Sequence, residues 1–419
     1  MSNQHLVFMD GVTGYLGRWT LFWYLEELRE ERIAVLIRPG KKGDRAKQDA
    51  QSRLDAVLDS IGMSSERHRV TAIPGELNSP FFGNRDAVES LAADAWIHMA
   101  GDITFKKLGD KSSLVTNRDY TVNFIEAARK TRFVPRTVCH TSTFYVFEKA
   151  DHPDEEFSVP EEFHDPSKME HHNAYGYSKL EAENYLHSLV KAGSLPFNLL
   201  VFRPDIIMHH IPVQEVALRN PGLITDDFKV IFQLLAAYIG KTKVKIPGGP
   251  SFDNPLRYIP VSMNTVLNIS DVDSVTKAMM QLAVLFGDGG LTPDGGCQIF
   301  HLVNRWQPMP VRFLRDLSET SEPELAGRIQ HVEPAHFKTD ILPKLSWMEK
   351  LYYTNFVEPF IGYMNRARTH AATDNVDNLL GEEWHNFHPA HQVDLGQWLE
   401  AGIRQAIEKD FGEPPKVKR

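Results

Sequence analysis

The stretch from residue 5 to residue 29 constrains the fold most, because an apolar run, three glycines and a helical pattern follow one another there. Leu6 to Met9 form the short apolar run expected of a buried parallel strand. Beyond the last glycine, Leu21, Phe22, Leu25 and Leu28 recur at helical spacing, which leaves Glu26, Glu27 and Arg29 to face water. This order predicts a strand, a tight turn and a helix.

The three glycines, Gly11, Gly14 and Gly17, lie at three-residue spacing between the strand and the helix. A phosphate binds at a helix N-terminus, where free backbone amides and the positive end of the helix dipole converge, provided that no Cβ blocks its approach. Nucleotide-binding doubly wound folds carry their phosphate loop at this first strand-to-helix junction. An ordinary glycine turn is the alternative interpretation.

The bulk composition excludes several classes of protein. A chain of 419 residues with a net charge of −9 suits one large α/β domain with an added lobe, or two domains, and gives no sign of nucleic-acid binding. Cys139 and Cys297 cannot form a disulfide framework, so we expect buried thiols in a reducing compartment. A strand that begins at residue 6 leaves no room for a signal peptide, and no apolar run is long enough to span a bilayer. These features predict a cytoplasmic protein, and they leave its oligomeric state open.

A basic group ends the second predicted strand, residues 33–37. Arg38 follows directly, and the pair Lys41 and Lys42 lies just beyond. NAD-binding folds place an acidic residue here to accept hydrogen bonds from the ribose, whereas a guanidinium suits a 2′-phosphate. The sequence therefore favours NADP(H), while NAD(H) stays open, as does a purely solvating role for these cations.

Further strands alternate with helices along the chain, which predicts an α/β fold with a doubly wound, mostly parallel Rossmann sheet. The predicted strands are 70–73, 95–99, 137–140, 198–207 and 297–304, and the predicted helices include 44–62, 117–130 and 173–190. The predicted organisation is a dinucleotide-binding domain at 1–207 with returning segments at about 256–304, a smaller, mainly helical C-terminal substrate lobe at 208–255 and 305–410, and a flexible tail at 411–419.

Tyr175 and Lys179 lie four residues apart on a predicted helix, so their side chains share one face. A nearby ammonium stabilises a phenolate and lowers the pKa of the tyrosine, which suits proton transfer. The hydroxyl of Thr143, at the end of the predicted strand 137–140, is placed to hold the substrate oxygen. We expect Thr143, Tyr175 and Lys179 to be the catalytic residues.

With these motifs the sequence resembles the extended short-chain dehydrogenase/reductase superfamily, whose members combine GxxGxxG, YxxxK and a serine or threonine. Within it, the sequence is most similar to the thioester reductase and fatty acyl-CoA reductase branch. The segments that carry this similarity are Leu36-Ile-Arg-Pro-Gly40, His140-Thr-Ser-Thr-Phe-Tyr-Val146, Tyr177-Ser-Lys-Leu-Glu-Ala-Glu183, Arg203-Pro204, Ile269-Ser-Asp-Val-Asp-Ser-Val275 and Phe300-His-Leu-Val-Asn304.

The resemblance implies that the glycines hold the pyrophosphate, Arg38 the 2′-phosphate, and Lys179 also the nicotinamide ribose. Pro204 and Ile206 would contact the nicotinamide. The complete set of expected cofactor-binding residues is Gly11, Thr13, Gly14, Tyr15, Leu16, Gly17, Arg38, Lys42, Glu76, Leu77, Ala100, Gly101, Tyr175, Lys179, Pro204 and Ile206.

Two positions depart from the pattern of this branch. Asp205 replaces the small residue usual after the Arg-Pro pair, and Gly101-Asp102 stands where an alanine pair is more common. Both positions would lie near the nicotinamide, so they bear on the substrate. The three histidines of the segment 385–391 match no metal-ligand spacing, and we expect no metal site.

The leading functional hypothesis is an NADPH-dependent reductase that converts an acyl thioester, bound to CoA or to a carrier protein, into an aldehyde or further into an alcohol. The alternative is an NAD(P)-dependent dehydrogenase, ketoreductase or epimerase that acts on a hydroxyl or ketone of a sugar, steroid or secondary metabolite. A third hypothesis is a nucleotide-sensing binding protein without activity, which would have no need for Thr143, Tyr175 and Lys179 together.

Overall fold

The computed structural model describes residues 5–40, 49–103, 106–149, 152, 154–208, 244–245, 251–252, 257–321 and 329–401. The predicted segments 208–255 and 411–419 therefore lie almost wholly outside the described residues, as does Lys42. No described helix is both long and apolar enough to cross a membrane.

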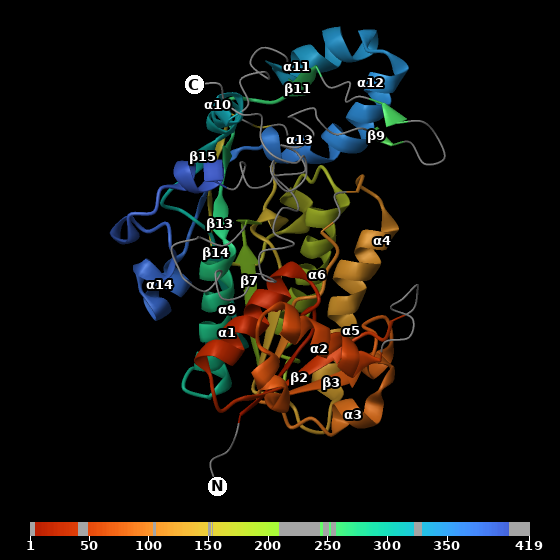
Figure 1. Ribbon diagram of the computed structural model, residues 1–419, viewed down its shortest axis with the longest axis vertical. Coiled ribbons are helices and arrows are strands. Elements are labelled where there is room, and N and C mark those ends of the chain that lie inside the picture. Colours follow the sequence, from red (N-terminus) through yellow and green to blue (C-terminus); the bar gives the residue numbers. More distant parts are fainter. Residues whose placement is uncertain are drawn as a thin grey trace.

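A seven-stranded parallel sheet forms the centre of the molecule, in the order β14-β7-β5-β4-β1-β2-β3 (Figure 1). Its strands are β1 (Leu6–Met9), β2 (Arg32–Ile37), β3 (Val70–Pro74), β4 (Ala95–His98), β5 (Thr137–Thr141), β7 (Asn198–Pro204) and β14 (Cys297–Leu302). The predicted doubly wound sheet is confirmed, and all seven predicted strands are present. β14 pairs with β7 after an intervening stretch of the chain, as a returning segment does.

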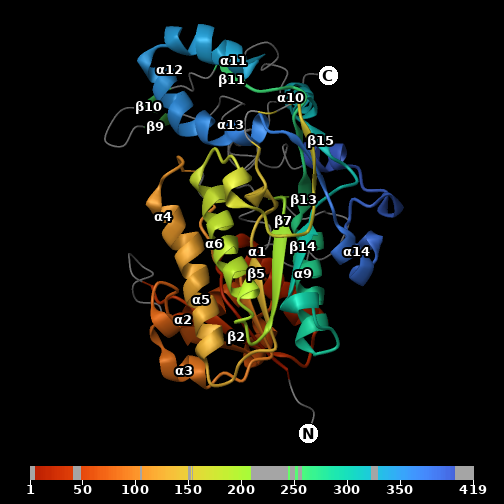
Figure 2. The same ribbon diagram turned by 180° about the vertical axis from the view of Figure 1, so that it is seen from behind.

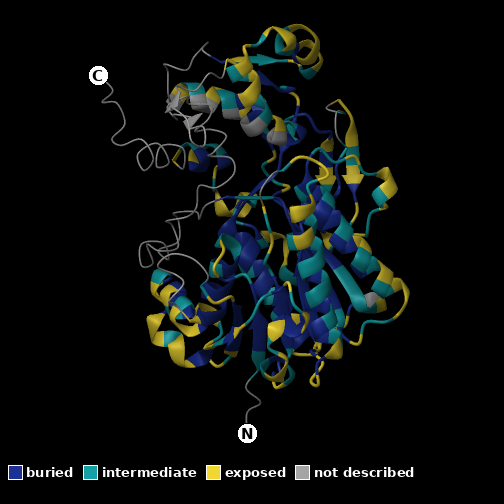
Figure 3. Ribbon diagram, turned by 90° about the vertical axis from the view of Figure 1, so that its right-hand side faces the viewer, coloured by how far each residue is buried: buried dark blue, intermediate teal, exposed yellow. Residues whose placement is uncertain are grey.

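Period-two alternation in the strands divides the core into two layers. Val7 and Met9 of β1 pack into a cluster with the helices of one face, and Phe8 packs into a cluster with those of the other. The helices of the first face are α1 (Tyr15–Glu27), α2 (Ala50–Ser60) and α9 (Val272–Gly287). Those of the second are α3 (Arg85–Glu89), α5 (Tyr120–Lys130) and α6 (Ala174–Lys191). Figures 1 and 2 show the two faces in turn, and Figure 3 shows the buried strands beneath helices with exposed outer sides.

The helix predicted at 117–130 begins earlier than its pattern indicated. A single turn at Lys111–Ser113 (α4) leads into a π-helical turn at Leu114–Asp119, and α5 continues from there. The π-helical turn contains Asn117, whose buried side chain belongs to the site described below. Such wide turns occur often at functional sites.

Most of the C-terminal elements gather at one end of the molecule, whereas α14 (Asp374–Leu380) lies beside β14 and α9 (Figures 1 and 2). The helices are α10 (Val311–Ser321), α11 (Pro334–His336), α12 (Trp347–Tyr352), α13 (Glu358–Met364) and α14 (Asp374–Leu380). Short strands pair as β8 (Ile206–Met208) with β13 (Ile269–Asp271), β6 (Glu156–Val159) with β17 (Arg368–Ala371), β11 (Tyr258–Pro260) with β16 (Gln330–Val332), β12 (Val266–Leu267) with β15 (Met309–Pro310), and β9 (Val244–Lys245) with β10 (Ser251–Phe252).

These elements have a hydrophobic cluster of their own, and they also contact the main sheet. Tyr352, Trp398 and Leu399 belong to that cluster. The ring of Tyr363 packs edge-on against Tyr145, which follows β5, with ring centroids 4.7 Å apart. Cys139 is buried in β5 as expected, but Cys297 is only partly buried because it begins the edge strand β14.

Candidate active site

The carboxyl ends of the parallel strands gather the predicted site residues at one edge of the sheet. The turn after β1 accepts only glycine at two positions. Gly11 has a φ of +74°, and a Cβ on Gly17 would lie 2.3 Å from the carbonyl oxygen of Gly11. α1 begins directly after Gly14, with neither a side-chain cap nor an acidic residue in its first turn. Because its first amides are uncapped, the turn fits a pyrophosphate.

The other predicted residues of this turn differ in burial, and one of them forms a hydrogen bond to another element. Thr13 is exposed, and Tyr15 and Leu16 are half-buried. Tyr15 donates a hydrogen bond to the carbonyl of Met208, 3.1 Å away, which ties α1 to β8. The predicted phosphate loop thereby lies beside the end of β8.

Asp10, which sequence reasoning missed, fixes the turn from below. Its Oδ1 accepts hydrogen bonds from the amides of Met99 and Ala100, at 2.7 and 2.8 Å, and its Oδ2 contacts His98 at 2.5 Å. The buried carboxylate therefore joins the end of β1 to the end of β4. The sequence signal for this role is the position of Asp10, a polar residue between an apolar strand and the first glycine.

The ends of β2 and β3 carry the residues predicted for the adenosine side. The side chain of Arg38 is exposed, as a group that meets a phosphate would be. Glu76 is half-buried, whereas the side chain of Leu77 packs in the core beneath the sheet. Leu77 can therefore face a nucleotide only through its backbone, because its side chain is committed to the core.

The end of β4 meets the predicted catalytic lysine. A Cβ on Gly101 would lie 3.2 Å from Lys179 Nζ and 3.0 Å from the side-chain oxygen of Asn117. Asn117 bonds both backbone groups of Asp102 and donates to Ser178, one residue before Lys179, at 2.9 Å. This asparagine joins the loop after β4 to α6, and its sequence position gave no indication of that role.

The structure brings Thr143 and Tyr175 together. The side chain of Asn173 caps α6 by accepting hydrogen bonds from the amides of Tyr175 and Gly176, at 3.0 and 3.2 Å, which sets the start of the helix. The hydroxyl of Tyr175 is hydrogen-bonded to that of Thr143. Thr143 also lies within 3.5 Å of the carbonyl oxygen of Pro204.

Burial sets the proton chemistry of this pair. It raises the pKa of Tyr175 to about 12, partly offset by the hydrogen bond from Thr143. That direction is opposite to the one expected from a neighbouring ammonium. Burial lowers the pKa of Lys179 to about 8, against the opposing effect of the Asp10 and Glu183 carboxylates. Lys179 donates a hydrogen bond of 2.8 Å to the carbonyl of Thr141.

An ion pair supports the catalytic strand end from beneath. Arg203 and Glu183, both buried, form a two-pronged contact at 2.9 and 2.5 Å. Glu183 also accepts a hydrogen bond from Ser142, the neighbour of Thr143, at 2.5 Å. Since a carboxylate and a guanidinium share two parallel bonds, the end of β5 is held firmly against α6 and β7.

The nicotinamide-side residues lie where β7 gives way to β8. Pro204 is buried and Ile206 is half-buried. Asp205 between them has an exposed fraction of 6 %, and burial raises the pKa of its carboxyl to about 8. Its Oδ2 accepts the amide of Asn304 at 3.0 Å.

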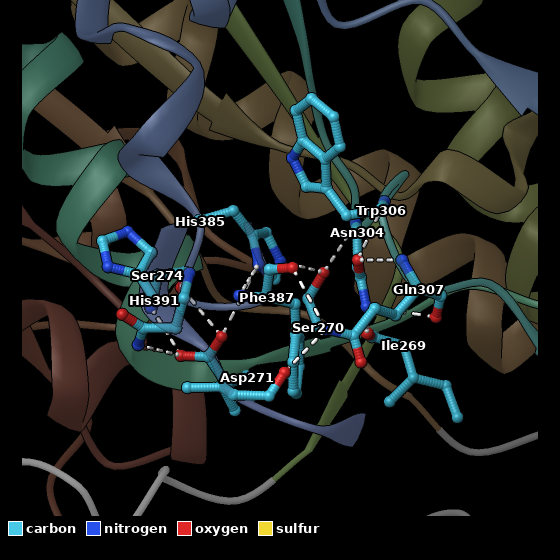
Figure 4. A network of polar contacts seen from close by, with 12 residues as sticks. Ile269, Ser270, Asp271, Ser274, Asn304, Trp306, Gln307, His385, Phe387 and His391 are labelled. Carbon is cyan, nitrogen blue, oxygen red and sulfur yellow. Dashed lines mark hydrogen bonds and ion pairs between the residues drawn. The ribbon is translucent and has the colours of Figure 1, made fainter. Parts of the chain in front are cut away.

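The C-terminal histidines His385 and His391 contact different parts of the protein. His385 is buried and hydrogen-bonded to Ser270 (Figure 4), whereas His391 is exposed and contacts the carbonyl of Glu383. Within the described residues, no group of three histidine, cysteine, aspartate or glutamate side chains lies close enough to hold a metal ion. The segment instead anchors the start of α9, where Asn386 bonds Asp271 at 3.0 Å.

Comparisons with known proteins identify the family and the fold. The sequence model of an NAD-binding family described as Male sterility protein matches residues 9–279. No curated protein matches the chain.

Among solved structures, the terminal R domain from the myxalamid PKS-NRPS biosynthetic pathway has a TM-score of 0.69 at 17% identity, covering 99% of this chain and 94% of that one. A thiolation-reductase di-domain from an archaeal non-ribosomal peptide synthetase has a TM-score of 0.62 at 17% identity, covering 98% and 92%. UDP-glucuronic acid 4-epimerase from Bacillus cereus, in complex with NAD, has a TM-score of 0.56 at 12% identity, covering 97% and 99%. At these identities the likeness shows the fold.

Proposed function

Because the chain belongs to the Male sterility protein family of NAD(P)-binding, extended short-chain dehydrogenase/reductase oxidoreductases, we propose that it is an NADPH-dependent reductase of acyl thioesters. The observation that carries the proposal is the hydrogen-bonded pair of hydroxyls, Thr143 and Tyr175, at the end of β5. Two hydroxyls that meet at one point can both bind a carbonyl oxygen on which charge develops.

The proposed mechanism assigns one task to each residue of the site. When bound, NADPH supplies the hydride. Thr143 and Tyr175 orient the carbonyl oxygen, and Tyr175 gives it a proton as the carbonyl carbon is reduced. Lys179, one helical turn along α6, keeps a positive charge beside the phenolate that remains.

A thioester then loses its sulfur. The carbonyl carbon has gained a hydride and the oxygen a proton, which gives a hemithioacetal. Its collapse breaks the carbon–sulfur bond and releases an aldehyde and a thiol, with the hydroxyl proton passing to the sulfur. A second round on the aldehyde would give the alcohol.

Two further observations support the choice of cofactor and substrate. The uncapped start of α1 suits a pyrophosphate, and the exposed guanidinium of Arg38, at the end of β2, suits a 2′-phosphate. The similar archaeal structure is titled a thiolation-reductase di-domain, so a carrier-bound acyl group is a natural candidate substrate here.

The test measures cofactor oxidation and thiol release together. The purified protein is given acyl-CoAs, an acyl group on a carrier protein, and simple ketones, each with NADPH and with NADH. We expect free thiol to appear in step with NADPH oxidation. Ketone reduction without thiol release would instead support the alternative, a ketoreductase or dehydrogenase.

Tyr175→Phe tests the proton donor directly. Removing the hydroxyl leaves the carbonyl oxygen without its proton source, so we expect kcat to fall by about 100-fold or more. NADPH affinity, measured by fluorescence titration, should stay within about twofold, because the ring remains. Tyr177→Phe, on the same helix, is the matched control and should keep full activity. Normal turnover of Tyr175→Phe would exclude this assignment.

A further inference from the structure

A directed chain of hydrogen bonds begins in the C-terminal segment (Figure 4). The amide of Phe387 donates to Nδ1 of His385 at 3.1 Å, so Nδ1 is the acceptor and the ring proton is on Nε2. Nε2 lies 3.0 Å from Ser270 Oγ and donates to it. Burial lowers the pKa of His385 to about 4, so the ring stays neutral and keeps this tautomer at neutral pH.

Ser270 accepts a hydrogen bond from His385 and donates one to Asp205. Its oxygen already accepts from His385 and from the amide of Asn304, at 3.0 Å each, so its own hydrogen points to the Asp205 carboxyl, with which it is hydrogen-bonded. The single amide hydrogen of Asn304 is shared between Ser270 and Oδ2 of Asp205, which also lies 3.0 Å from the amide nitrogen. Because Oδ2 receives hydrogens, a proton on this carboxyl belongs on Oδ1.

The series of hydrogen bonds ends at Oδ1 of Asp205. It is buried and has no hydrogen-bond partner within the described part of the protein. Burial raises the pKa of the carboxyl to about 8, so the group is mainly a neutral acid at pH 7. A buried hydroxyl donor without an acceptor is unfavourable, and a ligand carbonyl would satisfy it.

The position of Asp205 indicates which ligand that is. Asp205 directly follows Pro204, whose carbonyl oxygen lies 3.5 Å from the Thr143 hydroxyl. β7 is separated from β1 and its glycine turn by β4 and β5, so the two strand ends are roughly 14 Å apart at the usual strand spacing. A dinucleotide laid across the strand ends from that turn brings its nicotinamide to this point.

We propose that Asp205 is a cofactor-binding residue that donates its Oδ1 hydrogen to the carbonyl oxygen of the nicotinamide carboxamide. This inference rests on the proposed function, because it requires a nicotinamide nucleotide in the site. It would explain why an acidic residue, Asp205, stands where a small residue is usual after Arg203-Pro204.

The test compares binding of two nucleotides by calorimetry at pH 7. NADPH carries the carboxamide, whereas 2′-phospho-ADP-ribose has the same adenosine side and lacks the nicotinamide. In Asp205→Ala the donor is gone, so we expect NADPH affinity to fall roughly tenfold while the fragment binds as before. In Asp205→Asn the amide nitrogen can donate from the Oδ1 position, so affinity should stay within about threefold.

Asp94→Asn is the matched control, because it removes a carboxylate at the opposite, amino-terminal end of β4 and should change neither affinity. Circular dichroism of each variant checks that it is folded. The inference is overturned if Asp205→Ala binds NADPH as wild type does, if it loses both nucleotides equally, or if Asp205→Asn binds as weakly as Asp205→Ala. Failure of the wild-type protein to bind either nucleotide would instead overturn the proposed function.

A pH series adds a second readout. Above pH 8 Asp205 ionises and loses its donor, so wild-type affinity for NADPH should fall relative to Asp205→Asn, which cannot ionise. Among the described residues, other charged or titratable groups also face this region, namely Asp271, Tyr145 and the Arg366 guanidinium that is hydrogen-bonded to Tyr145. Lys179 also titrates near pH 8. All of these groups are present in both proteins, so their effects cancel in the comparison. Parallel pH profiles would contradict the assignment.

Discussion

Burial sets the acid–base character of three side chains at the strand ends. It raises the pKa of Tyr175 and of Asp205 and lowers that of Lys179. In each case burial shifts the pKa towards the neutral form, although Lys179, with a pKa of about 8, stays mainly protonated at pH 7. The resting site therefore offers neutral hydroxyl donors together with the Lys179 ammonium, which suits a neutral carbonyl whose oxygen gains negative charge during reduction.

Asp205 makes the stability of the protein depend on pH. The pKa of its carboxyl is about 8 in the fold and about 4 in an unfolded chain, so the unfolded form is ionised at a lower pH. The free energy of unfolding should therefore fall as the pH rises between these two values. Asp205→Asn lacks this loss, so its melting temperature should rise relative to wild type from pH 5 to pH 8. Melting curves of the two proteins that stay parallel over this range would argue against the buried acid.

The residue types of the site were readable from the sequence, but their partners were not. Thr143, Tyr175 and Lys179 stand at a strand end and on one helix face, which are local patterns. Asp10 and Asn117 act through hydrogen bonds to segments about 90 and 15 residues away, respectively. Asp205 was noticed only as a departure from a pattern, because its burial depends on Ser270 and Asn304.

The β1 turn and α1 act as one element, and Gly17 is its most restrictive position. Gly17→Ala would put a Cβ 2.3 Å from the Gly11 carbonyl oxygen, and that contact is with backbone that cannot move aside. We expect nucleotide binding to be lost in calorimetry and the melting temperature to fall by roughly 4 °C or more.

Gly290→Ala is the control for this substitution, because its Cβ would meet its nearest neighbour at an ordinary 3.7 Å. It should bind nucleotide normally. Unchanged nucleotide affinity in Gly17→Ala would show that the turn does not hold the pyrophosphate.

Among the elements, the strands were predicted well and the start of the helix before Lys130 was not. Strands of a parallel sheet are short apolar runs that a local window detects. The π-helical turn at Leu114–Asp119 depends on the tertiary contacts of Asn117, so the hydrophobic periodicity of the local sequence does not predict it. The short strand pairs of the C-terminal region escaped prediction for the same reason.

At the scale of the whole molecule, the C-terminal segment is joined to the cofactor side through His385. His385→Ala removes the donor to Ser270, and thereby loosens Asp205 and the start of α9. We expect the melting temperature to fall by several degrees, and NADPH affinity to fall more than affinity for 2′-phospho-ADP-ribose. His391→Ala, which alters an exposed side chain, should change neither quantity. Equal loss of both affinities would indicate general unfolding.

The late return of β14 to the sheet has a consequence for the synthesis of this protein. When β7 leaves the ribosome at residue 204, its outer edge has no partner until Cys297–Leu302 has also emerged. At about 5–20 residues per second, that edge stays open for about 5 to 20 seconds. During this time the nascent chain exposes an apolar strand that is buried in the folded protein, and the backbone groups along its edge are unpaired. Chaperones bind surfaces of this kind, and aggregation starts from them.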